Sequence, residues 1–368
     1  MGSDPFFCFF CFFGEADLTN PRWKQRPDGS TWGDYGPDDQ LGRLNLLTPE
    51  RVRRAALEIR EGHSFCLSIP LDYPGGNKIN PRRFGPTLKP TLREGKPMFS
   101  FPIERADAQN TDIISDDAAL ICLQYSTQWD SFAHVGAWFD ADADGIEEKV
   151  YYNGYRADIE ICGPKRYDAL SRGGMDHDCG DHIGAKQLGI ENFAVKGIQG
   201  RGVVVNLRRH FGDKRTKVGY DDLMRVFDAD KIEVEEGDIV LLYTGWTDLV
   251  MGMNKDPDMD ILDNACAALE GRDDKLLQWI SSSGIAALCA DNYAVEHLPA
   301  TPAPGRRPGL PLHQHCLFKL GVPLAEIMWL KDLAEWLDAN KRSRCFFTGP
   351  PLRLPGAVGS PMTPVATV

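Results

Sequence analysis

The chain has 368 residues, 42% hydrophobic and 26% charged, a balance that is typical of a folded protein and excludes a mostly disordered one. Its net charge of −12, from 53 acidic and 41 basic side chains, provides no basic face for nucleic acid or for an anionic membrane. No apolar run reaches the roughly 18 residues that span a bilayer. We therefore expect a cytoplasmic protein that binds a small-molecule substrate, with neither nucleic acid nor membrane as a partner.

The longest apolar run lies near the N-terminus, from Phe6 to Phe13. An acidic residue precedes it, and no basic segment or small-residue cleavage site accompanies it, so it does not resemble a secretory leader. We interpret residues 1–16 as a separate apolar segment. Residues 17–368 then form a single domain, with an irregular N-terminal arm and a C-terminal tail that wraps the surface. The scattered cysteines favour a reducing compartment.

Helical and strand patterns alternate along the rest of the chain. Thr48, Pro49 and Gly62 are typical of the N-cap, first turn and stop of a helix. Alternating side chains predict a strand over residues 65–69, and residues 72–118 look rich in loops. The sequence further predicts strands at 120–130, 202–207, 238–244 and 284–290, and helices near 220–228, 259–282 and 331–340. This order indicates a mixed α/β fold.

The segment from residue 124 to residue 134 carries the most informative polar pattern. If it is a strand, the side chains of Gln124, Gln128 and Asp130 share one face with Ser126. His134 follows Asp130 by four residues, so one turn after the strand can bring it over the same site. An edge strand facing solvent, with a satisfied histidine, explains this segment alone equally well.

Two later clusters favour a functional site. Asp291 and Asn292 follow an apolar strand at its carboxyl end, where sites form in α/β proteins. His313 and Glu326 bracket an apolar element and can point into one cavity. Glu326 stands among apolar residues, and a buried glutamate is rarely stable without a partner or a metal. Asp, His and Glu are ordinary ligands for zinc or manganese.

These segments together resemble the putative cyclase family of metal-dependent hydrolases, which includes bacterial kynurenine formamidase and isatin hydrolase. The resemblance covers nearly the whole chain, and the stretch 124–134 corresponds to the family motif His-x-Gly-Thr-His-x-Asp-x-Pro-x-His. Its Thr-Gln-Trp-Asp sequence indicates a large-chain subgroup. The other matching segments are Trp32-Gly33, 38–49, 197–207, 237–240, 244–246, 311–326, 351–356 and 359–361.

The resemblance implies roles for four residues. Asp130 corresponds to a metal ligand of the motif, and its closing histidine, His134, corresponds to the general base; we expect both to be catalytic. His313 and Glu326 correspond to the later ligands. The implied fold is the swivelling β/β/α type, with mixed sheets and flanking helices, and the implied assembly is a homodimer or homotetramer.

The motif departs from the family where two histidine ligands are replaced by Gln124 and Gln128. An amide oxygen is a weaker zinc ligand than imidazole. We therefore expect about one divalent ion per chain, zinc or manganese, held mainly by Asp130, His313 and Glu326. Gln128 and Gln124 are additional candidate ligands.

We predict a metal-dependent hydrolase that cleaves a C–N bond, in an amide, lactam or formamide, of a small aromatic or cyclic substrate. Four aromatic side chains are candidate walls of its pocket, although core packing explains each equally well: Trp32, Trp129, Phe132 and Trp138. One alternative is a cyclase, lactonase or dehydratase of a biosynthetic pathway, using the same acid–base site with little or no metal. Another is a binding protein without activity.

Overall fold

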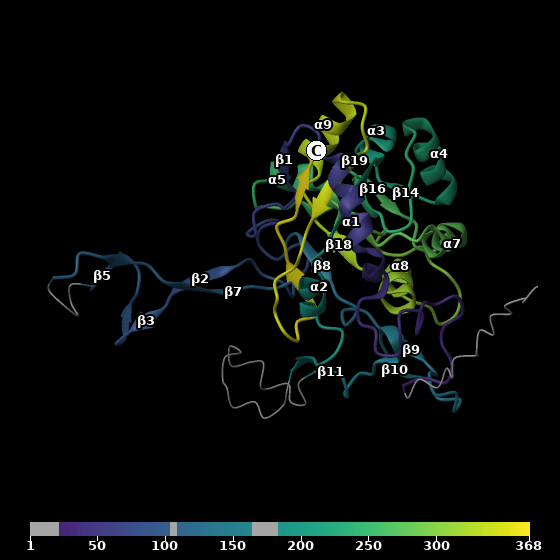
Figure 1. Ribbon diagram of the computed structural model, residues 1–368, viewed down its shortest axis with the longest axis horizontal. Helices are drawn as coiled ribbons and strands as arrows, with labels where there is room; N and C mark the ends of the chain where they lie inside the picture. The colour runs from purple at the N-terminus through teal and green to yellow at the C-terminus, as the bar shows by residue number, and fades with distance from the viewer. Residues whose placement is uncertain (1–21, 104–108, 164–182) are drawn as a thin grey trace, which may run out of the picture.

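The computed structural model describes residues 22–103, 109–163 and 183–368 (Figure 1). The apolar segment at residues 1–16, with Phe6 to Phe13, lies outside this part of the chain. Within it, no helix is long and apolar enough to cross a bilayer.

A nine-stranded mixed sheet organises the body of the molecule. Its central strands are parallel, and antiparallel strands extend it on both sides. In spatial order the strands are β1 (Ser64–Cys66), β21 (Val365–Thr367), β19 (Arg344–Thr348), β13 (Gln199–Asn206), β15 (Ile239–Tyr243), β17 (Ala287–Ala290), β18 (Leu324–Glu326), β8 (Gln128–Asp130) and β20 (Gly359–Pro361). The sheet with its flanking helices confirms the predicted mixed α/β fold.

The central strands are buried because helices cover both of their faces. All side chains of β15 and β17 are buried, as their continuous apolar runs predicted. The helices around the sheet are α1 (Pro49–Ala55), α2 (Glu191–Lys196), α3 (Leu207–Phe211), α4 (Tyr220–Asp230), α5 (Trp246–Gly252), α6 (Met259–Leu262), α7 (Asp274–Ser283), α8 (Pro311–His313) and α9 (Lys331–Ala339). Thr48 caps α1 by accepting a hydrogen bond from Arg51 N, as predicted.

Short helical turns and small two-stranded sheets complete the fold. The turns are η1 (Gly42–Leu46), η2 (Ala56–Glu58), η4 (Tyr152–Gly154) and the π-helix η6 (Gln314–Leu320). The strand pairs are β9 (Ala137–Phe139) with β10 (Glu148–Val150), β11 (Ile161–Cys162) with β12 (Gly184–Ala185), and β14 (Thr216–Val218) with β16 (Ala267–Leu269).

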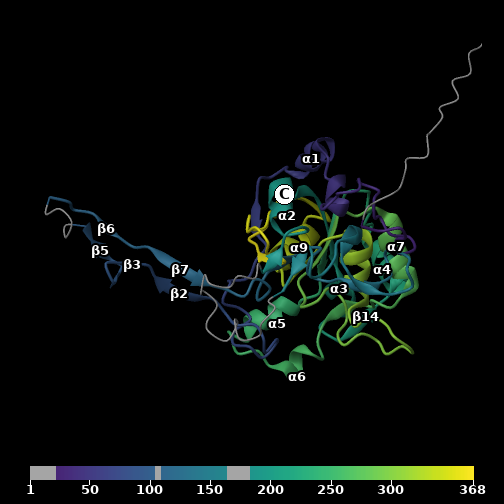
Figure 2. The same ribbon diagram turned by 90° about the horizontal axis from the view of Figure 1, so that it is seen from below.

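A long β-ribbon projects from the body within the segment predicted to be rich in loops (Figures 1 and 2). Its pairs are β2 (Thr87–Pro90) with β7 (Asp117–Leu120), β3 (Leu92–Arg93) with β4 (Lys96–Pro97), and β5 (Phe101–Pro102) with β6 (Ile113–Ile114). Large apolar side chains on this ribbon are exposed: Leu88, Leu92, Phe99, Ile113 and Leu120. No other described part of the chain covers these side chains. An isolated two-stranded ribbon is marginally stable in water, so a surface that covered this one would stabilise it.

Three predicted elements differ in the structure. The strand predicted over 120–130 is interrupted: Leu120 ends β7, the chain turns through residues 123–127, and β8 begins at Gln128. The helix predicted over 259–282 is interrupted by β16, whose pairing with β14 outweighs local helix propensity. The tail 350–368 was predicted to wrap the surface; residues 352–355 are exposed, but β20 and β21 are strands of the main sheet, so the end of the tail differs from the prediction.

Candidate metal centre

Strand pairing brings three polar side chains to one face of the sheet. In β8, Gln128 lies opposite Glu326 of β18, and Asp130 lies opposite Leu324. Residues two apart in a strand share a face, so Gln128, Asp130 and Glu326 point to the same side. All three are buried, and Gln128 Nε2 donates to Glu326 Oε2 at 2.9 Å. The carboxylates of Asp130 and Glu326 therefore sit together in the interior. Among the described residues neither forms an ion pair with a lysine or arginine, although the charge of Arg83 acts on Glu326.

His313 completes this cluster from the end of α8. Its Nε2 lies 3.0 Å from Glu326 Oε1 and 3.9 Å from Asp130 Oδ2. Its Nδ1 lies 2.7 Å from Glu296 Oε1. The chain continues directly into the π-helix η6, an irregularity that is frequent at functional sites.

Burial and mutual repulsion perturb the titration of the cluster. Burial, together with the nearby Asp130 carboxylate, raises the pKa of Glu326 to about 7. Burial by itself would lower the pKa of His313, but hydrogen bonds to Glu296 and Glu326 outweigh it and raise that pKa to about 10. Without a bound cation the cluster therefore retains protons to offset its negative charge.

The donor set of this cluster fits a divalent cation. Asp130, His313 and Glu326 each offer a ligand atom, and these atoms all lie within 4.8 Å of one another. Asp130 Oδ1 and Gln128 Oε1 are buried without a hydrogen-bond partner. Buried polar atoms are normally satisfied, and a cation coordinated by oxygen would satisfy both. Asp130, His313 and Glu326 would hold it, with Gln128 as a fourth candidate.

His134 lies at the open side of the cluster. A turn closed by the hydrogen bond from His134 N to Ser131 O brings it back over β8, as the four-residue spacing predicted. Its Nε2 is 3.9 Å from Asp130 Oδ1, beyond hydrogen-bond distance, and its side chain is 24% exposed. It is therefore the member of the group that solvent or a substrate reaches, whereas the ligand candidates are enclosed.

Glu296 belongs to the site but was not identified from the sequence. Its side chain accepts hydrogen bonds from the backbone N–H groups of Leu312 and His313, as well as facing His313 Nδ1. A carboxylate on Nδ1 orients the ring and leaves Nε2 to face the cluster. The available signal was similar to that for Glu326, an acidic residue beside apolar neighbours, here Ala294 and Val295, which precede Glu296.

Gln124 occupies a different position from the one predicted. It precedes β8, in the turn, so it does not belong to the strand face that carries Gln128 and Asp130. Its amide nitrogen is buried without a partner, against the backbone of β20. A Cβ at Gly359 would approach that nitrogen to 2.5 Å, so glycine is required for this contact. No hydrogen bond between described residues links the Gln124 side chain to the cluster.

The predicted aromatic pocket residues fall into two groups. Trp32, Trp129 and Phe132 are fully buried. Trp129 donates from Nε1 to Gly349 O, and Trp32 contacts other aromatic rings edge-on, so both have ordinary core environments. Trp138 is exposed on β9. A role for these four in substrate binding remains a prediction.

Asp291 joins the carboxyl ends of β15 and β17. Its carboxylate accepts hydrogen bonds from Thr244 N, Thr244 Oγ1 and Gly245 N, and burial raises its pKa to about 7. These contacts position the turn into α5. Its role is to connect two strands, whereas the adjacent Asn292 faces a cavity.

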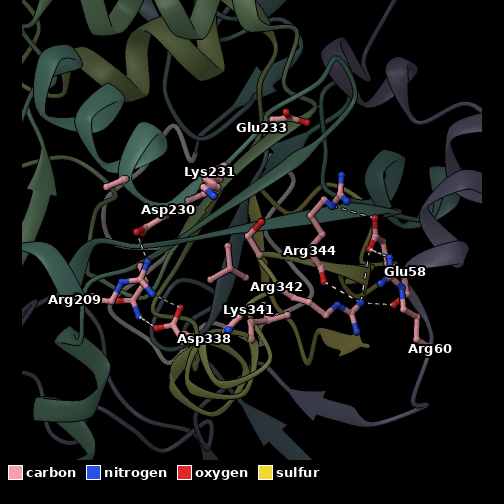
Figure 3. Close-up of a pocket in the computed structure, with 17 residues that line it drawn as sticks. Glu58, Arg60, Arg209, Asp230, Lys231, Glu233, Asp338, Lys341, Arg342 and Arg344 are labelled. Carbon is pink, nitrogen blue, oxygen red and sulfur yellow. Dashed lines mark hydrogen bonds and ion pairs between the residues drawn. The ribbon is translucent and has the colours of Figure 1, made fainter.

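A cavity of about 570 Å³ lies apart from the metal-ligand cluster (Figure 3). Figure 3 shows Arg209 paired with Asp230 and Asp338 on one side, and Glu58 paired with Arg344 on the other. None of the metal-ligand candidates lines this cavity. Because its arginines are neutralised by carboxylates in its own wall, it is an ion-pair network and not the candidate site.

Comparisons with known proteins agree with this geometry. A family model described as Putative cyclase matches residues 65–297, which include β8 and Glu296. The chain belongs to the putative cyclase family. A solved structure described as a novel cyclase is 29% identical to this family member, covers 92% of this chain and 97% of its own, and superposes with a TM-score of 0.69.

Solved structures at lower identity share the fold. Isatin hydrolase A from Labrenzia aggregata, bound to benzyl benzoate, is 11% identical, with 85% of this chain and 94% of that chain covered and a TM-score of 0.51. The enzyme from Ralstonia solanacearum is 13% identical, with 87% and 97% covered and a TM-score of 0.50. A search of curated proteins found no match. These likenesses confirm the predicted cyclase-type fold.

Proposed function

We propose that this protein is a metal-dependent hydrolase that cleaves a C–N bond of an amide, lactam or formamide in a small aromatic or cyclic substrate. The observation that supports this best is the buried cluster of Asp130, His313 and Glu326, with a carboxylate oxygen and an amide oxygen left without partners. Such a group is costly to bury unless a cation completes it. Family membership favours the same function.

The residues of the cluster have distinct roles in this proposal. A divalent ion bound there would supply Lewis acidity, polarising the scissile carbonyl and lowering the pKa of water. His134, at the open side, would accept a proton from the attacking water and return it to the leaving nitrogen. Glu296 is a positioning residue, since it acts by orienting His313.

A cyclase, lactonase or dehydratase that works with little or no metal is the second candidate. One observation favours it: His313 lies between Glu296 and Glu326 with its pKa raised to about 10, so an imidazolium there partly balances the carboxylates without a cation. With His313 paired to Glu296 and Glu326 in this way, Asp130 and His134 would be left to act as the acid–base pair of the reaction.

Metal analysis together with a substrate screen tests the two candidates. Protein purified without chelator should carry about one zinc or manganese per chain, because only one of the two candidate ligand groups among the described residues, Asp130, His313 and Glu326, is buried. It should hydrolyse members of a panel of aryl amides, lactams and formamides, and chelator should abolish this turnover. Activity that persists in chelator, in protein without metal, would favour the second candidate.

We also propose that the chain is a homodimer or homotetramer. The exposed apolar side chains of the β-ribbon support this, because a partner surface would cover Leu88, Leu92 and Ile113. Light scattering coupled to size-exclusion chromatography should show a multiple of the chain mass. The triple change of these three residues to serine should lower it, and a monomeric wild type would refute the proposal.

A further inference from the structure

A cavity of about 430 Å³ lies beside the metal-ligand cluster. The proposals above give it no part in metal binding or in proton transfer. Two of its wall residues connect it to the cluster. Glu296, whose carboxylate holds His313, lines the cavity. Asn292 also lines it, and the backbone oxygen of Asn292 accepts a hydrogen bond from Ile327 N, the residue after Glu326. The cavity is thus separated from the cluster by Glu296 on the side of His313 and by Asn292 on the side of Glu326.

Part of the cavity wall is apolar and aromatic. Trp246 and Tyr293 face each other with ring centroids 6.3 Å apart and an interplanar angle of 33°. Ile79, Met259 and Leu262 extend this surface. Flat walls of this kind favour a planar ligand, and the volume is within the range of small-molecule sites.

Arg215 provides an unpaired positive charge in the same wall. Its Nη1 and Nη2 donate to the backbone oxygens of Ala265 and Leu298, at 3.4 Å and 3.1 Å, and its Nε is buried without a partner. Guanidinium has five N–H donors, so more than half of its donors lack an acceptor in the protein. It forms no ion pair with any described residue. Arg215 is half-buried, and the charge of the exposed Asp263 acts on it from beyond ion-pair distance, so its guanidinium remains free to bind an anion.

The other polar groups of the wall do not supply that anion. Asp263 is exposed at the rim and forms no ion pair with Arg215, whereas Glu296 is committed to His313 and Leu312 N. His297 has its Nδ1 3.1 Å from Pro299 O. Asn292 is 3% exposed; its Nδ2 donates to Ala267 O, and its Oδ1 is buried without a donor. The cavity therefore presents both an unpaired cation and an unpaired hydrogen-bond acceptor.

We propose that this cavity binds a planar carboxylic acid whose carboxylate is held by Arg215 and which also donates an N–H or O–H to Asn292 Oδ1. Arginine binds carboxylates through paired, charge-assisted hydrogen bonds, which makes it the specificity residue of the site. Assigning this acid to the substrate rests on the proposed hydrolase function. Binding of the acid itself does not.

Calorimetric titration with 2-aminobenzoate tests the binding, since this probe is planar and carries both a carboxylate and an N–H donor. It should bind the wild type at millimolar concentration or tighter. The neutral 2-aminobenzamide should bind about 10- to 100-fold more weakly, and so should the probe to Arg215→Met. Arg215→Lys, which retains the charge but not the fork, should be intermediate. Arg225→Met is the matched control, because Arg225 is exposed and pairs with Asp222.

The outcomes separate this proposal from the hydrolase function. Absence of binding to folded wild type, or equal binding of acid and amide, would overturn the acid site, as would unchanged binding to Arg215→Met. Binding of 2-aminobenzoate by protein that carries its metal but turns over no member of the substrate panel would retain the acid site and reject the hydrolase. With an acidic substrate, a higher KM in Arg215→Met at unchanged kcat supports the substrate assignment. Non-competitive inhibition by 2-aminobenzoate would instead assign the cavity to a separate regulatory acid.

Discussion

Substitution of Glu296 by glutamine should weaken metal binding without removing any ligand. Glu296 receives hydrogen bonds from three groups: Leu312 N, His313 N and His313 Nδ1. In Glu296→Gln the amide oxygen can still accept from His313, but the amide nitrogen faces Leu312 N–H, and two donors cannot pair. The buried N–H left unsatisfied should cost about 1–3 kcal/mol of unfolding free energy.

The effect on the metal follows from the loss of charge behind His313. A neutral amide makes the imidazole less basic and holds its ring less firmly, and changes of this kind typically cost about 10- to 100-fold in metal affinity. This corresponds to about 1.4–2.8 kcal/mol of binding free energy. Competition with a chromogenic chelator measures the affinity for zinc and manganese, and thermal unfolding of the metal-free protein measures the stability.

Glu335→Gln is the matched control. Glu335 is an exposed carboxylate on α9, 3.8 Å from Lys331, so its substitution should change neither quantity appreciably. A folded Glu296→Gln protein that binds metal as tightly as the wild type would show that His313 is not a ligand oriented by Glu296. Loss of activity at unchanged metal affinity would point to His313 acting as a charged group without a metal.

Three further predictions concern the same cluster. His134→Ala should lower turnover about 10²- to 10⁴-fold with metal content and unfolding temperature retained, because His134 is placed as a base and not as a ligand. Loss of the metal together with activity would show that His134 is a metal ligand. The double change Gln124→His and Gln128→His should raise zinc affinity in competitive titration. Because only Gln128 donates a hydrogen bond to Glu326, Gln128→His alone should account for most of the gain. An unchanged zinc affinity would place both amides outside the metal site. Metal affinity should rise with pH, because the pKa values of His313 and Glu326 are raised to about 10 and about 7, so that a metal ion must displace protons to bind. Each displaced proton contributes up to about tenfold in affinity per pH unit. An affinity that does not change between about pH 6 and pH 9 would contradict this.

Local sequence patterns predicted the elements whose determinants are short in range. The cap at Thr48 and the buried runs that became β13, β15 and β17 depend on neighbouring residues and on apolar composition, and they were correct. The resemblance also identified Asp130, His313 and Glu326, and the structure brings these three together. Their proximity could be anticipated because the motif carries information about distant contacts that no single segment contains.

Contacts between distant segments determined the remainder. The tail looked irregular because proline and glycine dominate it, yet β20 and β21 are strands, since pairing with β8 and β19 satisfies their backbone groups. Gln124 was placed on the strand face by alternation, but the turn before β8 removed it from that face. Glu296 lies 17 positions from His313 in the sequence, and only the folded chain places its carboxylate on the imidazole.

The sequence by itself determined the fold class, the family and the chemical types of the candidate ligands, because apolar patterning and motif residues are local properties of the chain. Only the tertiary structure decided how those ligands are satisfied: the carboxylate behind His313, the oxygens of Gln128 and Asp130 left without partners, and the unpaired Arg215 beside them. Hydrogen bonds and burial depend on which segments meet in space, and that is settled when the sheet forms and encloses them.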